Sequence, residues 1–325
     1  LKNHNHALPL DLSAPVALFG RVQKNYFYVG NGSGGDVSAP YSINLVQGRV
    51  NAGVQLDSTV LAAYESWCTA SVNDPDPGFW GHWPRYYAEM PVKQDWVQAA
   101  AKRCQTAVVV IGRSAGEDRE NTLKKGSFYL TNKEKALMDA VTAAFQKVVL
   151  VLNIGSIMDF AEIDAYGDKI SAILLAWQLG MESGNAVADV LTGQVNPSGR
   201  LTDTIAKTYA DYPAQNFGNK AENRYTEDIF VGYRYFETFA PERVLYPFGY
   251  GLSYTDFACK VTKTETKDQT VTVQVQVENT GALPGKQVVQ LYACCPCGAL
   301  GKAAKVLIAF GKTEKLAPGK HQSLT

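Results

Sequence analysis

The run RSAGEDR, residues 113–119, is the part of the sequence best suited to chemistry. It directly follows a buried apolar run that ends at Ile111, and ligand sites in open α/β sheets lie beyond the carboxyl ends of strands. A carboxylate there, flanked by small residues that leave room for a substrate, is a reasonable general acid or base. The alternative interpretation is a solvated turn held by salt bridges, and position alone does not decide between the two.

A glycine-rich segment, GNGSGGD at residues 30–36, is the second candidate. Glycine-rich loops cradle phosphate groups in nucleotide-binding proteins. This segment lacks the GxGxxG spacing, and Pro40 interrupts the helix that should open after it. A binding or domain-contact loop is therefore favoured over a dinucleotide site, with a simple tight turn as the alternative. Residues 31–33 also match a glycosylation sequon, which is weak evidence by frequency alone.

A third feature is the long surface loop predicted over residues 72–91. It contains DPDPG at 74–78 and three nearby aromatic residues. Loops of that length are often functional.

Other familiar catalytic arrangements are not evident. The four histidines have no clear nucleophile as partner and no GxSxG motif is present, so a hydrolase of the Ser-His-Asp type is not expected. Six cysteines are too few for a disulfide scaffold at this length, which favours reduced thiols and a cytoplasmic protein over a secreted or periplasmic one. The cysteines at 294, 295 and 297 could hold zinc together with Cys259, but four-ligand sites usually show two spaced pairs. We expect neither a metal nor a cofactor.

Composition and charge limit the classes of function. Lysine and arginine number 31, as do aspartate and glutamate, so no net field draws the chain onto nucleic acid or an anionic membrane. The longest apolar run, at 148–154, has the length of a strand, whereas a membrane span needs ~20 residues. With 46% apolar residues in 325, the chain is expected to fold into about two domains. Neither nucleic acid nor a membrane is an expected partner.

Up to about residue 250, short apolar runs alternate with helical stretches, which predicts a mainly parallel sheet covered by helices. The capping box TNKE at 131–134 begins an amphipathic helix that continues to Phe145. A second helix is predicted over 184–191, with its end at Gly193. The runs predicted as buried strands are 16–20, 107–111, 148–154 and 171–177.

Beyond Tyr254 the hydrophobic period changes to two. The valines at 271, 273, 275 and 277 alternate with polar residues, as in a strand with one wet face. Further strands at 287–292 and 306–310, punctuated by Pro-Gly turns, predict an antiparallel sandwich. Such a sandwich needs about 100 residues and roughly 70 are present, so its last strands are expected to be missing. The chain also begins without a methionine, and we expect a fragment of a longer protein.

Several segments together resemble the accessory domains of glycoside hydrolase family 3, the family of β-glucosidases and their relatives. Their order and spacing make chance agreement improbable, and they cover nearly the whole chain. The segments are LKN at 1–3 with ALPL at 7–10, GGDV at 34–37, RSAGEDR at 113–119, residues 177–189, NPSGRL at 196–201, residues 225–236 and YPFGYGLSY at 246–254.

The resemblance implies an α/β sandwich domain over residues 1–250 and an incomplete fibronectin type III-like β-sandwich over residues 251–325, in agreement with the patterns above. In this family a third unit, a TIM-type barrel, supplies the aspartate nucleophile and most of the sugar-binding pocket. A barrel of ~250 residues does not fit into a chain already occupied by two other domains. The resemblance therefore implies a barrel outside this chain, placed after it as in one bacterial branch or before it as is usual.

The same resemblance implies that Glu117 is the general acid/base of a retaining β-glucosidase, with Asp118 as the alternative if the register shifts by one. Arg113, Gly34 and Asp36 are then expected at the rim of the site or in contact with the substrate. The implied substrate is a terminal β-D-glucosyl residue of a β-glucoside or cello-oligosaccharide. A β-xylosidase or another exo-acting enzyme is the alternative within the family. A non-catalytic carbohydrate-binding or interaction module is the alternative for the isolated chain.

Overall fold

The computed structural model describes residues 1–35, 37, 39–75, 78–117, 120–214, 221–222, 224–296 and 301–325. The chain divides into two compact units, Leu1–Val195 and Asn196–Thr325, and each is considered by itself. Residues 196–250 cluster with the second unit. The domain boundary expected near residue 250 from the sequence stays a prediction.

The first unit is built around a mixed five-stranded sheet in the order β1-β5-β4-β3-β2. Strands β2 to β5 are parallel, and the short β1 pairs antiparallel with β5. Seven of the eight residues are buried in both β3 and β4, as expected for strands covered on both faces. The strands are β1 (Lys2–Asn3), β2 (Val16–Phe19), β3 (Thr106–Arg113), β4 (Lys147–Ile154) and β5 (Ala172–Leu175).

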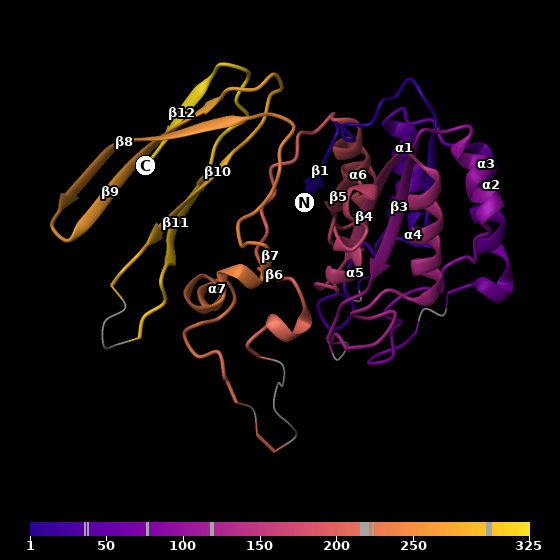
Figure 1. The fold of residues 1–325 in the computed structure, drawn as a ribbon, viewed down its shortest axis with the longest axis horizontal. Coiled ribbons are helices and arrows are strands. Elements are labelled where there is room, and N and C mark those ends of the chain that lie inside the picture. Colours follow the sequence, from indigo (N-terminus) through magenta and orange to yellow (C-terminus); the bar gives the residue numbers. More distant parts are fainter. Residues whose placement is uncertain are drawn as a thin grey trace. The chain divides into compact units, whose positions relative to one another are not determined.

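Helices pack against this sheet and against one another (Figure 1). Helix α1 contacts α6, α3 contacts α4, and α2 and α4 contact β2 and β3 respectively. The helices of the first unit are α1 (Leu45–Asn51), α2 (Ser58–Thr69), α3 (Gln94–Ala101), α4 (Asn132–Ala144), α5 (Ala161–Asp164) and α6 (Ser183–Thr192).

Helix α4 follows β3 in the chain and begins with the predicted capping box. The Thr131 side chain accepts a hydrogen bond from the Glu134 N–H over 3.1 Å, and the Glu134 carboxylate accepts one from the Thr131 N–H over 2.7 Å. At the end of α6, Gly193 has φ 77°, the left-handed conformation that favours glycine after a helix. Both helix signals in the sequence are therefore confirmed.

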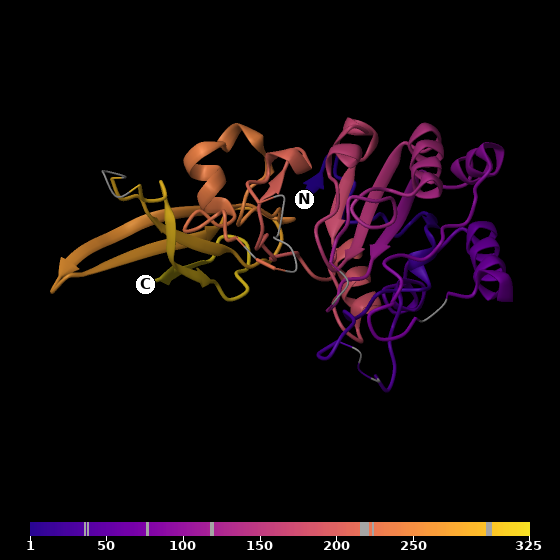
Figure 2. The same cartoon turned by 90° about the horizontal axis from the view of Figure 1, so that it is seen from below.

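The second unit consists mainly of antiparallel strands (Figure 2). One sheet has the order β12-β9-β8, a second pairs β10 with β11, and a third pairs β6 with β7. Its elements are β6 (Ile205–Ala206), α7 (Tyr233–Phe239), β7 (Val244–Tyr246), β8 (Phe257–Lys267), β9 (Thr270–Asn279), β10 (Val288–Ala293), β11 (Val306–Lys312) and β12 (His321–Leu324).

The predicted fold class is confirmed. A mainly parallel sheet with helices is followed along the chain by antiparallel sheets. Among the described residues, no helix is long and apolar enough to cross a membrane.

Candidate functional site

Glu117 lies just beyond the end of β3, at the edge of the sheet where the parallel strands β2 to β5 have their carboxyl ends. We call residues 114–130, between β3 and the cap of α4, the acid loop, and residues 30–35 the glycine-rich loop. The Asn31 N–H donates to the Ala115 carbonyl over 2.8 Å, and the Glu117 N–H donates to the Asn31 carbonyl over 3.1 Å. The structure thus brings the two candidate segments side by side.

The carboxylate of Glu117 is exposed and is held by one residue of the glycine-rich loop. Its Oε2 accepts hydrogen bonds from the Ser33 hydroxyl over 2.5 Å and from the Ser33 N–H over 2.9 Å. These two bonds, the hydroxyl first, lower the pKa of Glu117. Gly32 makes the approach possible, because its φ is 108° and a Cβ there would lie 2.5 Å from the Glu117 Cβ. The carboxylate is therefore favoured in its ionised form.

The remaining predicted residues of this edge are only partly described. Gly34 is exposed, and a Cβ at this position would have no atom within 4 Å, so the space beside it is open. Asp36 and Asp118 lie outside the described residues. A role at the rim for Gly34 and Asp36, and the alternative role for Asp118, stay predictions.

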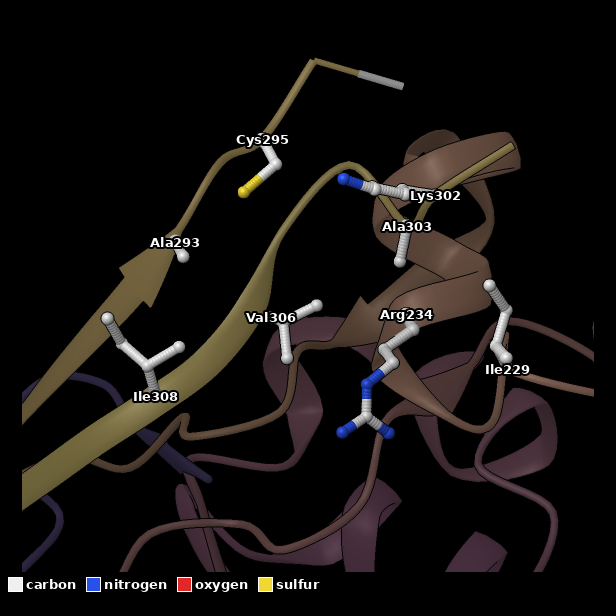
Figure 3. A pocket seen from close by; sticks show the side chains of 8 residues that line it. All are labelled: Ile229, Arg234, Ala293, Cys295, Lys302, Ala303, Val306 and Ile308. Atoms are coloured by element: carbon white, nitrogen blue, oxygen red, sulfur yellow. The ribbon is translucent and has the colours of Figure 1, made fainter. Parts of the chain in front are cut away.

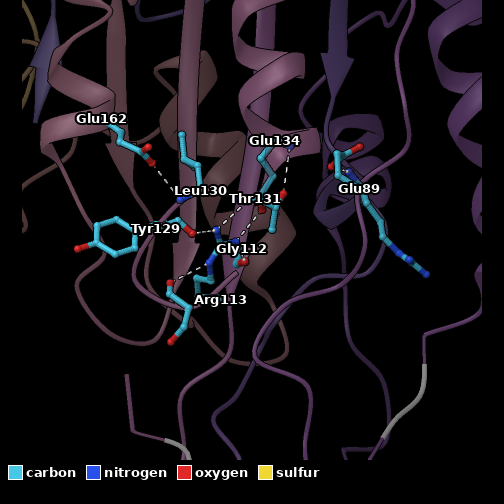
Figure 4. Close-up of polar contacts among 10 residues, drawn as sticks. Glu89, Gly112, Arg113, Tyr129, Leu130, Thr131, Glu134 and Glu162 are labelled. Atoms are coloured by element: carbon cyan, nitrogen blue, oxygen red, sulfur yellow. Dashed lines mark hydrogen bonds and ion pairs between the residues drawn. The ribbon is translucent and has the colours of Figure 1, made fainter. Parts of the chain in front are cut away.

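Arg113, predicted at the rim or on the substrate, directs its side chain into the protein instead. The side chain is 2% exposed and forms a bidentate ion pair with Glu134, with distances of 2.7 and 2.8 Å (Figure 4). A buried guanidinium in this position does not reach a sugar in solvent. No local sequence pattern indicates this orientation, because the partner carboxylate lies 21 residues further along the chain.

The long loop predicted over residues 72–91 is hydrogen-bonded to the start of the acid loop. The Ser114 N–H donates to the Arg85 carbonyl over 2.9 Å, and the Ser114 hydroxyl donates to the Pro84 carbonyl over 2.5 Å. Trp83 is buried, and its ring meets that of the half-exposed Trp80 edge to face at 5.2 Å. We call residues 78–91 of this loop the aromatic loop. The sequence predicts the loop, but it does not predict the hydrogen bonds to Ser114 that hold it near Glu117.

A buried carboxyl group in the aromatic loop, that of Glu89, was not found by sequence reasoning. Its Oε1 accepts hydrogen bonds from the Tyr64 hydroxyl over 3.1 Å and the Met90 N–H over 2.8 Å, and its Oε2 accepts one from the Arg21 N–H over 2.8 Å. Burial raises the pKa of Glu89 to about 7. In Figure 4 it lies apart from the pair of Arg113 and Glu134. A glutamate in a predicted loop carries no signal of burial.

The second unit has a surface pocket of about 340 Å³. Its lining includes Cys295, which belongs to the zinc alternative, but none of the candidate catalytic or rim residues. Apolar side chains line most of it, together with the cationic Arg234 and Lys302 (Figure 3). In the described part of the chain, no three His, Cys, Asp or Glu residues gather as ligands of a metal would. Cys297, which belongs to the zinc alternative, lies outside that part.

The parallel sheet, the capped helices and the loop that presents Glu117 at the carboxyl edge define an α/β domain with an exposed carboxylate. Residues 1–254 match the model of the glycosyl hydrolase family 3 C-terminal domain, and the chain belongs to this family.

Similar proteins carry β-glucosidase names. A β-glucosidase of Ruminococcus albus is 44% identical over 99% of this chain and 34% of its own length, and β-glucosidase A of Butyrivibrio fibrisolvens is 38% identical over 100% and 43%. A solved β-glucosidase structure from Paenibacillus barengoltzii has a TM-score of 0.96 at 43% identity and covers 100% of this chain and 36% of that one. The chain thus spans less than half the length of these relatives.

Proposed function

We propose that this chain supplies the general acid/base, Glu117, of a retaining β-glucosidase whose aspartate nucleophile lies in a TIM-type barrel domain outside the chain. The observation that carries the proposal is the exposed Glu117 carboxylate on a loop at the carboxyl edge of the sheet. The β-glucosidase names of relatives that extend beyond this chain support it.

The proposed reaction needs two carboxyl groups with different roles. The aspartate carboxylate attacks the anomeric carbon, the bond from that carbon to the glycosidic oxygen breaks, and the Glu117 proton moves to the departing oxygen. In the second step the Glu117 carboxylate takes a proton from water. The oxygen of that water bonds to the anomeric carbon, and the bond to aspartate breaks to release glucose. Glu117 returns to its protonated form, so the cycle is balanced.

The first step requires a protonated Glu117, whereas the two hydrogen bonds from Ser33 favour the carboxylate. In a retaining glycosidase the two carboxyl groups stand ~5 Å apart, and the negative charge of the aspartate raises the pKa of its neighbour. Exclusion of water by a closed sugar pocket raises it further. Engagement of the barrel is therefore the event that converts Glu117 from base to acid.

The test uses the full-length protein and two substrates that differ in their leaving group. The sugar that departs from cellobiose is a poor leaving group, so its oxygen must be protonated as the bond breaks. Dinitrophenolate is a good leaving group, so 2,4-dinitrophenyl β-glucoside hardly needs this protonation. We expect Glu117→Gln to lower kcat/KM for cellobiose by ~100-fold or more, and the dinitrophenyl substrate to be far less affected. Azide should restore turnover of the dinitrophenyl substrate by Glu117→Ala and give glucosyl azide.

Two neighbouring acidic residues provide the controls. Glu120→Gln changes an exposed carboxylate of the same loop and should leave both substrates unaffected. Asp118→Asn tests the alternative assignment, and a selective loss on cellobiose in this variant alone would transfer the role to Asp118. If neither Glu117→Gln nor Asp118→Asn changes the ratio of the two kcat/KM values, the proposal is wrong.

A second candidate substrate is a pentopyranoside. An exo-α-(1→6)-L-arabinopyranosidase of Bifidobacterium longum is 35% identical over 62% of this chain. Aryl β-glucoside, β-xyloside and α-L-arabinopyranoside can be compared directly with the full-length protein. A kcat/KM for either pentoside above that for the glucoside would favour the pentosidase, and Glu117 would keep the same role.

A further inference from the structure

The side chain of Arg113 joins the two ends of the acid loop. Arg113 is the last residue of β3, immediately before the loop begins. Its Nε donates to the Ser127 carbonyl over 3.0 Å, and its Nη2 donates to the Tyr129 carbonyl over 3.2 Å. Both carbonyls belong to the part of the loop that returns to α4. One guanidinium therefore contacts both the point where the chain leaves β3 and the segment that leads into α4.

The other donors of the guanidinium are also engaged. Nη1 donates to the Gly112 carbonyl over 2.7 Å, and the two Nη atoms form the bidentate pair with Glu134 (Figure 4). All five N–H groups of Arg113 thus have an acceptor, which is the full capacity of the side chain. Glu134 is fixed in turn by the Thr131 N–H in the first turn of α4. A planar fork of five donors is needed to make these contacts together, and a lysine ammonium has three.

The same guanidinium contacts the aromatic loop. Its central carbon lies 5.8 Å from the centre of the Tyr86 ring. A Cβ at Gly126 in the acid loop would overlap this ring, so Tyr86 also packs closely against the loop itself. Together with the two hydrogen bonds of Ser114 to the aromatic loop, these contacts fix the start and the return of the acid loop.

We propose that Arg113, paired with Glu134, is a positioning residue for Glu117, because it fixes the base of the loop on which Glu117 meets the leaving group. The inference rests on the proposed function of Glu117. Proton transfer tolerates little displacement of the acid, and a shift of ~1 Å can cost ~100-fold in rate. Without the fork of Arg113 the start of the loop keeps its contacts through Ser114, but the link between the start and the return of the loop is lost. The carboxyl group is then no longer held at the departing oxygen.

The variant Arg113→Lys in the full-length protein tests this. It keeps the positive charge beside Glu134 and removes the fork. We expect kcat/KM for cellobiose to fall by about tenfold or more and that for 2,4-dinitrophenyl β-glucoside by less than about threefold, because only the first needs the acid in place. The ratio of the two constants does not depend on how much of the protein is folded. A role in stability alone would lower both constants equally.

A matched control is available in the same unit. Arg103 also forms a two-point pair with a carboxylate at the start of a helix, Asp57 before α2, with distances of 2.6 and 3.0 Å. Arg103→Lys removes a fork of the same kind away from the acid loop and should leave the ratio unchanged. Glu134→Gln is the second variant and should change the ratio in the same direction as Arg113→Lys, so the test does not depend on one protein that folds poorly.

The possible outcomes separate the two proposals. The inference is supported if Arg113→Lys and Glu134→Gln change the ratio and Arg103→Lys does not. It is overturned if Glu117→Gln changes the ratio but Arg113→Lys and Glu134→Gln do not. It is also overturned if Arg103→Lys changes the ratio as much as those two variants do. If Glu117→Gln itself leaves the ratio unchanged, the proposed function fails, and the inference fails with it.

Discussion

Two glutamates, Glu117 in the acid loop and Glu134 in the first turn of the helix that follows it, show how the surroundings of a carboxylate decide its role. Glu134 is 5% exposed and gives its two carboxylate oxygens to the two Nη atoms of Arg113. Glu117 is exposed and is held through Oε2 by Ser33, while Oε1 accepts no hydrogen bond among the described residues. Pairing and burial fix Glu134 as a structural group, whereas the free oxygen of Glu117 remains able to exchange a proton.

Glu89 is a useful third case, because it is buried like Glu134 but has no cation beside its carboxyl group among the described residues. Its hydrogen bonds come from two backbone N–H groups and a tyrosine hydroxyl. Burial raises its pKa to about 7, and the negative charge of Glu134 adds to the effect. Burial without a cationic partner therefore gives a group that titrates, rather than a permanent ion pair.

The largest expected difference between Glu134 and Glu117 is in their contribution to stability. Glu134→Ala leaves the Arg113 guanidinium buried without its counter-ion, which typically costs ~3–5 kcal/mol. Glu117→Ala removes an exposed side chain and should leave the Tm unchanged. Urea unfolding followed by fluorescence measures both. Equal destabilisation by the two substitutions would contradict the division of roles, and Asp57→Ala, which unpairs the more exposed Arg103, provides an intermediate reference.

A smaller effect is expected from Glu89, and it depends on pH. Between pH 4.5 and about 7 the folded state holds a proton that the unfolded state has released, so stability falls as the pH rises through this window. A pKa raised from 4.5 to about 7 corresponds to about 3 kcal/mol. Glu89→Gln does not ionise and should lose this dependence.

The measurement is the free energy of unfolding of the native protein and of Glu89→Gln at pH 5 and pH 7.5. Because other groups titrate identically in both proteins, the difference between the two curves isolates Glu89. Parallel curves would show that Glu89 is ionised throughout the range.

The sequence predicts the parts of this arrangement that depend on near neighbours. The capping box at 131–134 lies within four residues, and the continuous apolar runs of β3 and β4 indicate strands buried on both faces. The contacts that distinguish the carboxylates link distant residues. Arg113 is 21 residues from Glu134, and Ser33 is 84 from Glu117. No local pattern encodes these pairs, because the sheet brings them together.

The smallest effect is expected at Ser33. Ser33→Ala removes the hydroxyl that donates to Glu117 but keeps the backbone N–H, so the pKa of Glu117 should rise toward its ordinary value. A general acid acts in its protonated form, so the alkaline limb of kcat/KM against pH should move to higher pH in the full-length protein. Ser33→Thr retains a hydroxyl and should keep the native profile.

An unchanged alkaline limb in Ser33→Ala would have a specific meaning. It would show that the contact between Ser33 and Glu117 is broken in the complete enzyme, so that the barrel alone sets the pKa of the acid. In that case Ser33 contacts Glu117 only before the barrel engages. In the complete enzyme, Arg113 at the base of the loop would then position Glu117 without the help of Ser33. A shifted limb would instead show that the Ser33 hydroxyl still contributes to the pKa of Glu117 in the complete enzyme.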